Sequence, residues 1–170
     1  PNCKESPGGL RDLQVIRWMA KAAGFGASWA QIARSGLLTN QEASDLRRAE
    51  SAFKRLRVEL HLLAGRREDR LVFDMQHALS QVYGLEATET RRASEILMQR
   101  YYWAARLVTQ LNTLLVQCIE ENLFPIPDSQ AQPIDHCFYS LNARLDIQDP
   151  LLFQKDPAQI LRAFLVMQQH

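Results

Sequence analysis

The sequence predicts a mainly α-helical protein, an antiparallel helical bundle built around two long helices. Apolar residues recur every three or four positions over residues 43–63 and again over residues 93–118. Two long helices that each carry one apolar stripe bury those stripes against other helices, which indicates a bundle. The chain has 170 residues, enough for one domain with its own core.

Capping and breaking residues divide the first part of the chain into helices. The apolar pattern predicts a first helix from Leu10 to near Gly24. Ser28 is a suitable N-cap for a short second helix, which Gly36 ends. Residues 39–42 (TNQE) have the spacing of a capping box, in which the first and last side chains satisfy each other's backbone N–H groups. This box predicts the start of the first long helix.

The two long helices are separated by a shorter one. Gly65 occupies the C-cap position of the first long helix, and residues 73–83 predict a helix that Gly84 follows. The second long helix ends before Pro125.

Beyond this proline the helical pattern changes. Residues 134–148 predict a small β-hairpin, and Asp156 followed by Pro157 predicts the start of a last helix. We therefore expect a helical bundle over residues 1–124, a linker over 125–133 and a C-terminal hairpin with a helix over 134–170.

Composition argues against several classes of protein. The 20 Lys and Arg residues nearly balance the 19 Asp and Glu residues, so the charge gives no reason to expect nucleic acid. No apolar run approaches the ~20 residues of a membrane span, and a signal-peptide pattern is lacking. Cys3, Cys118 and Cys137 form no CxxC pair, so we expect reduced thiols in a cytoplasmic protein. The chain begins at Pro1 and ends within a pattern at His170, which indicates a segment of a longer protein.

The most informative segment is residues 1–14 (PNCKESPGGLRDLQ). Consecutive glycines let the backbone approach another group closely or take positive φ. A Gly-rich turn that opens a helix is expected to point free N–H groups toward an anion such as phosphate. The simpler interpretation is a turn that Pro7 and the glycines form without a ligand. The candidate site residues are the two glycines and three of the charged residues of this segment: Lys4, Gly8, Gly9, Arg11 and Asp12.

Residues 1–14 resemble the motif that follows the nucleotidyltransferase core in the bacterial bifunctional PII uridylyltransferase/uridylyl-removing enzymes. Residues 61–74 (HLLAGRREDRLVFD), 98–102 (MQRYY) and 149–153 (DPLLF) resemble further motifs of this family, in the same order. The resemblance covers essentially the whole chain. It departs at Ser6, where the family pattern has glycine.

The resemblance implies that this chain is a middle segment of such an enzyme, between its nucleotidyltransferase and HD hydrolase domains. These enzymes use Mg²⁺ to transfer UMP from UTP to a tyrosine of the PII signalling protein when nitrogen is limiting. They remove the UMP by hydrolysis when glutamine is abundant. The segment would be non-catalytic, would orient the catalytic domains and would border the nucleotide site.

Lys4, Arg11 and Asp12 are the side chains that the resemblance brings closest to the nucleotide. Cationic donors there would stabilise charge on the transferring nucleotide. The alternative assigns Arg11 and Asp12 to a helix start, where the macrodipole stabilises Asp12.

The chain itself is not expected to hold a complete active site. It lacks the Gly-Ser turn and the clustered aspartates of a nucleotidyltransferase. None of its four histidines is followed by aspartate, so we expect no metal ligands among them: His61, His77, His136 and His170.

The charged run over residues 66–70 is a second candidate site. Its arginines could bind phosphate in bidentate fashion, but a structural network of ion pairs is the favoured interpretation. Arg100 is expected to project within the apolar stripe of the second long helix, where an unpaired charge is costly. We therefore expect it to pair with a carboxylate of residues 66–74 and to hold that loop on the helix. The expected participants in this network are Arg66, Arg67, Asp69, Arg70 and Arg100.

Two other interpretations stay open. The corresponding helical segment of glutamine synthetase adenylyltransferase carries isoleucine and glutamate in its Gly-Gly motif, where this chain has Leu10 and Asp12. A free-standing helical protein-interaction domain would bind through basic residues of the first long helix, a face that solvent explains more simply: Arg47, Arg48, Lys54 and Arg55.

Overall fold

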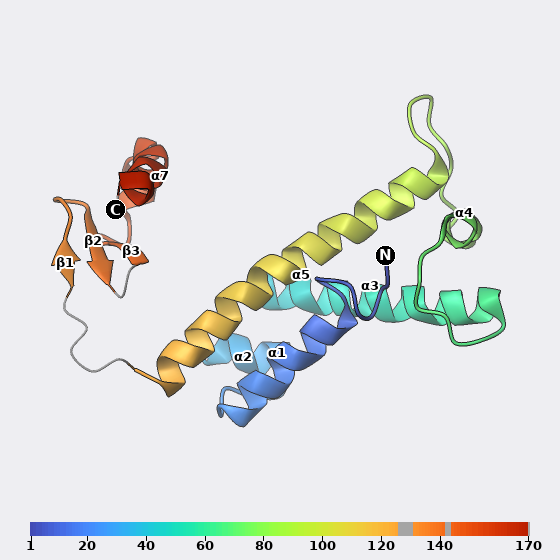
Figure 1. Ribbon diagram of the computed structural model, residues 1–170, viewed down its shortest axis with the longest axis horizontal. Coiled ribbons are helices and arrows are strands. Elements are labelled where there is room, and N and C mark those ends of the chain that lie inside the picture. The colour runs from blue at the N-terminus through green and yellow to red at the C-terminus, as the bar shows by residue number, and fades with distance from the viewer. Residues whose placement is uncertain (126–130, 142–143, 170) are drawn as a thin grey trace. The chain divides into compact units, whose positions relative to one another are not determined.

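The computed structural model describes residues 1–125, 131–141 and 144–169. Contacts within the chain divide it into two compact units, Pro1–Phe124 and Pro125–His170 (Figure 1). None of the described helices combines the length and the hydrophobicity that a membrane span requires.

The first unit is helical, and its helix ends follow the capping residues. Gln31 and Ser28 form a capping box at the second helix, and Thr39 and Glu42 form one at the third. Gly65 ends the third helix in the left-handed conformation, with φ 61°. The helices are α1 (Leu10–Ala22), α2 (Trp29–Arg34), α3 (Asn40–Ala64), α4 (Phe73–Val82) and α5 (Ala93–Leu123). These bounds confirm the mainly helical prediction.

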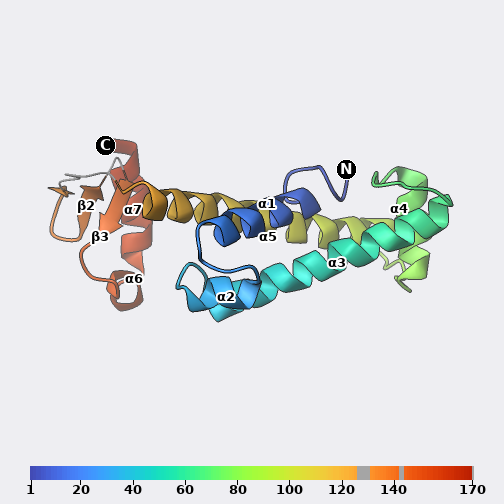
Figure 2. The same ribbon diagram turned by 90° about the horizontal axis from the view of Figure 1, so that it is seen from below.

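Helix α5 contacts most of the other helices in this unit. α1, α3 and α4 pack against it, and α2 packs against α3. α1 runs in the same direction as α5, whereas α3 runs in the opposite direction and crosses α5 obliquely (Figures 1 and 2). The apolar stripes predicted for the long helices supply the buried residues of both, including Phe53 and Leu115. In α5 the buried face includes Ala105 and Ile119, each one residue after a position of the predicted stripe (Ala104 and Cys118), since 3.6 residues per turn make the stripe drift.

The second unit combines a small sheet with two helices. Its elements are β1 (Gln132–Pro133), β2 (Phe138–Leu141), β3 (Arg144–Ile147), α6 (Leu152–Lys155) and α7 (Ala158–Gln169). The strands are antiparallel in the order β1-β2-β3, with Phe138 opposite Ile147. The β2–β3 pair confirms the predicted hairpin, while β1 lies at the end of the segment predicted as linker. Residues 126–130 of that linker lie outside the described residues.

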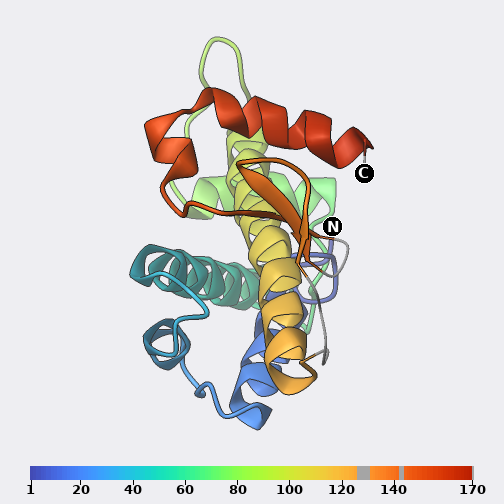
Figure 3. The same ribbon diagram turned by 90° about the vertical axis from the view of Figure 1, so that its left-hand side faces the viewer.

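The core of the second unit is small. Phe138 and Val166 are buried together, so α7 packs against the sheet (Figure 3). Most apolar side chains of α7 are exposed, among them Leu161, Phe164 and Met167.

Candidate functional site

Two motifs that are far apart in the sequence lie side by side in the first unit. The backbone N–H of Cys3 donates to the carbonyl of Asp69 at 2.8 Å, and the N–H of Leu71 donates to the carbonyl of Pro1 at 2.7 Å. The N-terminal turn is thereby fixed to the loop that follows α3. The structure thus joins the first two family motifs into one site.

The two glycines of the turn are required by close packing. Gly8 has φ 77°, and a Cβ on it would lie 2.1 Å from the carbonyl oxygen of Ala105 in α5. A Cβ on Gly9 would lie 2.8 Å from the carbonyl oxygen of Ser6. Neither position has room for a side chain: Gly8 lets the turn pack directly on α5, and Gly9 lets the turn close on itself.

The backbone N–H groups at the start of α1 are engaged within the turn itself. The N–H of Gly8 donates to Oδ2 of Asp12 at 2.7 Å. Three further N–H groups donate to carbonyls of the turn: those of Gly9, Leu10 and Arg11. The expectation that these groups are free for phosphate is therefore wrong. Asp12 has the helix-start role of the alternative interpretation, and a ligand here would be contacted by side chains.

The charged side chains of the turn gather around Glu5. Its Oε1 accepts from Nη2 of Arg11 at 2.9 Å and lies 3.0 Å from Nζ of Lys4. Hydrogen bonds from Arg11 and then from Lys4 lower the pKa of Glu5 to about 2. One exposed carboxylate thus lies between two cations, and the group keeps a net positive charge.

Asp69 anchors the loop after α3 through its side chain. Oδ1 of Asp69 accepts from Nε of Arg57 at 2.5 Å and lies 3.3 Å from Nε2 of His61. Burial favours the neutral form of Asp69, but hydrogen bonds from Arg57 and His61 outweigh that effect and hold its pKa below the usual range. This loop is therefore attached to α3 by an ion pair.

The remaining charges of the loop point outward. Glu68 accepts from the backbone N–H groups of Asp69 and Arg70, and Nη2 of Arg66 lies 3.5 Å from its carboxylate. The side chains of Arg66, Arg67 and Arg70 are exposed. The predicted ion-pair network is thus limited to Arg66–Glu68 and the pair that Asp69 makes with α3.

The role predicted for Arg100 is wrong. Its side chain is exposed, and no carboxylate of the described residues forms an ion pair with it. Arg57 in α3 pairs with Asp69, one of the carboxylates of residues 66–74 that were expected as possible partners of Arg100. The physical reason is helical phase, because Arg100 precedes the buried Tyr101 and one residue turns the side-chain direction by about 100°. The loop is therefore held by α3 and the N-terminal turn.

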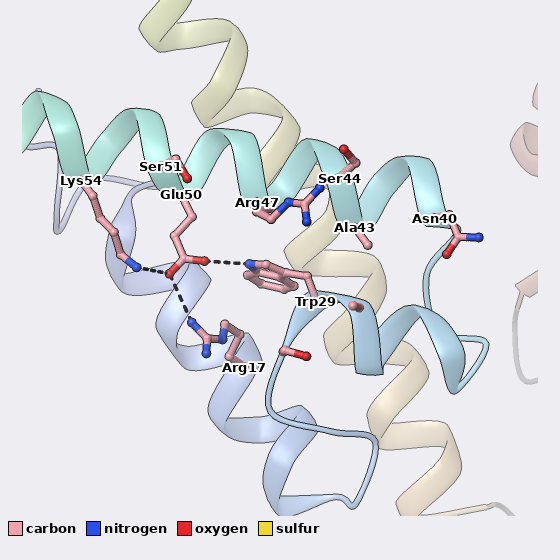
Figure 4. Close-up of a pocket in the computed structure, with 11 residues that line it drawn as sticks. Arg17, Trp29, Asn40, Ala43, Ser44, Arg47, Glu50, Ser51 and Lys54 are labelled. Carbon is pink, nitrogen blue, oxygen red and sulfur yellow. Dashed lines mark hydrogen bonds and ion pairs between the residues drawn. The ribbon is translucent and has the colours of Figure 1, made fainter.

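A buried carboxylate that the sequence analysis missed lies beside a pocket of about 530 Å³. Glu50 is 9% exposed and accepts from Nε1 of Trp29 at 2.7 Å, Nζ of Lys54 at 2.6 Å and Nη1 of Arg17 at 3.2 Å (Figure 4). These bonds link α1, α2 and α3. The available signal was helical phase, since Glu50 lies three residues before the buried Phe53.

This network also occupies part of the basic face proposed for a protein-interaction domain. Lys54 pairs with Glu50, and Arg48 pairs with Asp45. Arg55 lies over the ring of Tyr83, with its guanidinium carbon 4.9 Å from the ring centroid. Most of that face is thus engaged within the chain.

In the second unit, the described residues bring together three side chains that could ligate a metal. The ligand atoms of Asp135, His136 and Cys137 lie within 4.8 Å of one another. Asp135 already accepts from the backbone N–H of Cys137 at 2.7 Å and from Nη2 of Arg162 at 2.7 Å. Mg²⁺ takes oxygen ligands, so this set with its thiol and imidazole does not fit the ion. This cluster is therefore not assigned to Mg²⁺.

Comparisons with known proteins place these motifs in one family. The family model described as GlnD PII-uridylyltransferase matches residues 1–116. The chain is 70% identical over 170 residues to the bifunctional uridylyltransferase/uridylyl-removing enzyme of Bordetella pertussis, covering 100% of the chain. It is 53% identical over 169 residues (99% of the chain) to that of Ralstonia nicotianae, and 51% over 167 residues (98%) to that of Burkholderia vietnamiensis. It spans 20%, 20% and 19% of these relatives.

No solved structure matches the chain. The family model covers most of the helical unit, including both motifs that form the joined site. These three relatives match over 98% to 100% of the chain, so the match includes the second unit. On this evidence the chain belongs to the GlnD PII-uridylyltransferase family.

Proposed function

We propose that this chain is a non-catalytic helical segment of a bifunctional uridylyltransferase/uridylyl-removing enzyme, one that orients the catalytic domains and borders the nucleotide site. The observation that carries the proposal is the 70% identity to the Bordetella pertussis enzyme over the whole chain. The adenylyltransferase alternative has no such support, since the matching family model describes uridylyltransferases.

In this proposal the chemistry belongs to parts of the enzyme outside this chain. Those parts would transfer UMP from UTP to PII, hydrolyse it off again and respond to glutamine. Mg²⁺ would be held there as well, in a cytoplasmic enzyme. The chain contributes side chains at the edge of the nucleotide site and a connection between domains.

The N-terminal turn is suited to the edge of an anion site because the backbone that carries its cations is fixed in place. The turn is held by close packing of Gly8 on α5 and by backbone hydrogen bonds to the loop after α3. Arg11 and Lys4 share Glu5, and an exposed ion pair of this kind contributes little stability. A nucleotide phosphate can therefore displace Glu5 and recruit both cations without disturbing the fold.

The test is Arg11→Ala in the full-length enzyme, with Arg34→Ala as the matched control. Arg34 is exposed on α2 and lies outside the turn. Loss of a charge-assisted hydrogen bond of about 1.5–3 kcal/mol predicts a KM for UTP raised by roughly tenfold or more. The rate of uridylyl removal should stay unchanged, as should both activities of the control. An unaltered KM in Arg11→Ala would reject the border role and leave the chain as a scaffold.

The orienting role is supported by apolar side chains that the first unit leaves in solvent. Phe73 is 86% exposed and lines a surface hollow with Pro1 and Tyr102. Exposed apolar groups gathered at one place typically mark an interaction surface. Phe73→Ser should leave the unfolding of the chain unchanged and alter the rates of both activities in the full-length enzyme. Rates equal to wild type would exclude this hollow as a domain contact.

A further inference from the structure

A second pocket, of about 260 Å³, lies between α3, α5 and the segment that follows α4. Buried apolar and aromatic side chains from the two long helices line it: Phe53, Leu56, Leu97 and Tyr101. The rings of Phe53 and Tyr101 meet edge to face with their centroids 5.5 Å apart, so one wall is a packed aromatic pair. A pocket lined in this way gains contacts only when an apolar group fills it.

Two arginines give the pocket its polar character. Arg55 comes from α3 and lies against the ring of Tyr83, while Arg100 comes from α5 and is exposed. Among the described residues, the lining contains no acidic side chain, and neither arginine forms an ion pair. The lining therefore carries two positive charges that the chain does not neutralise through an ion pair.

Tyr83 adds one hydrogen-bonding group to the lining. Burial raises the pKa of Tyr83, the charge of Arg55 lowers it and the charge of Glu59 raises it, with a net increase. The hydroxyl is thus neutral at physiological pH and can donate to an anion. Glu59 lies outside the pocket lining.

We propose that this pocket binds a small aromatic anion, a planar system of one or two rings that carries one carboxylate or phosphate group. The ring fills the apolar space against Phe53 and Tyr101, and the anionic group lies at the rim with Arg55 and Arg100. The volume is below the ~300–1,000 Å³ of pockets for drug-sized ligands, which sets the upper limit on ring size. Guanidinium groups suit this ligand because they both stack on aromatic faces and pair with oxyanions.

The pocket adjoins the N-terminal turn without being part of it. The hydroxyl of Tyr101 donates to the carbonyl of Asn2 at 3.4 Å, while the ring of Tyr101 lines the pocket. No residue of the turn lines the pocket. The pocket is therefore distinct from the proposed border of the nucleotide site, and its test does not depend on that proposal.

The experiment measures binding of 2-naphthoate to the full-length protein by isothermal titration, with 2-naphthyl phosphate and neutral 2-naphthamide as comparison probes. Arg100→Gln removes one rim charge, and Ala52→Trp fills the pocket from an exposed position of α3. Arg106→Gln is the matched control, because Arg106 is exposed on the same helix as Arg100 and lies outside the lining.

We expect 2-naphthoate or 2-naphthyl phosphate to bind with one-to-one stoichiometry, and the tighter of the two identifies the anionic group. Arg100→Gln should weaken that binding by about tenfold, the size of one charge-assisted hydrogen bond. Ala52→Trp should abolish it, and Arg106→Gln should leave it unchanged. The proposal is overturned if neither anion binds, if binding survives Ala52→Trp, or if 2-naphthamide binds as tightly as the anions.

Discussion

The packing of the N-terminal turn on α5 makes Gly8→Ala the most informative single substitution in the chain. Gly8 has φ 77°, and the added Cβ would lie 2.1 Å from the carbonyl oxygen of Ala105. The position therefore combines an unfavourable backbone conformation with a steric overlap. Because the overlapping atom belongs to the backbone of a helix, it cannot move away by a change of rotamer.

The two contributions can be estimated separately. A residue with a Cβ in the left-handed region costs about 1–2 kcal/mol. Overpacking in a closed site adds typically 1–3 kcal/mol. We therefore expect Gly8→Ala to lower the free energy of unfolding by about 2–5 kcal/mol.

Gly65→Ala is the matched control, because it isolates the backbone contribution. Gly65 has φ 61°, and a Cβ there would have no neighbouring atom within 4 Å. Its substitution should cost only about 1–2 kcal/mol. Urea unfolding followed by the helical circular dichroism signal gives both values. Equal losses in the two variants would refute the conclusion that close approach to α5 is what requires glycine at position 8.

Three further predictions concern buried polar groups and thiols. Trp29→Phe should lower the free energy of unfolding by about 2 kcal/mol, since it removes a hydrogen bond to the buried carboxylate of Glu50; a urea midpoint equal to wild type would contradict this. Folding lowers the pKa of Asp69, so its contribution to stability is complete above its unfolded pKa of about 3.9 and is lost as pH falls through the folded value. Asp69→Asn should therefore flatten the fall in the free energy of unfolding measured between pH 7 and pH 3. Burial, followed by the charge of Asp69, raises the pKa of Cys3 to about 11. Iodoacetamide at pH 8 should therefore modify the partly exposed Cys118 at least about a hundredfold faster than the buried Cys3, as measured by mass spectrometry of peptides.

The sequence predicted most accurately the features that depend on neighbours along the chain. Ser28 and Thr39 start their helices through capping boxes with residues three positions later, and Gly65 ends α3 in the conformation expected of a C-cap. The β2–β3 hairpin likewise pairs segments that are close in sequence. Each of these signals is complete within a few residues, so these features depend little on tertiary contacts.

The features that the sequence did not predict depend on partners from other elements. Asp69 pairs with Arg57, which α3 brings to it, whereas the sequence analysis had expected Arg100 to pair with a carboxylate of residues 66–74. Glu50 is buried because Trp29 and Arg17 reach it from two other helices. A one-dimensional pattern contains no information on which of several nearby opposite charges becomes the partner.

The Gly-Gly motif shows how one sequence signal can correspond to two different physical roles. Glycine permits either an open backbone cradle for an anion or close approach of two backbones. Here the N–H of Gly8 bonds to Asp12, and the missing side chain of Gly8 is what admits the carbonyl of Ala105. An anion at this turn would therefore be bound by the side chains of Lys4 and Arg11, whose positions the glycines fix indirectly. It follows that Gly8→Ala should impair stability and nucleotide binding together, whereas Arg11→Ala should impair nucleotide binding alone.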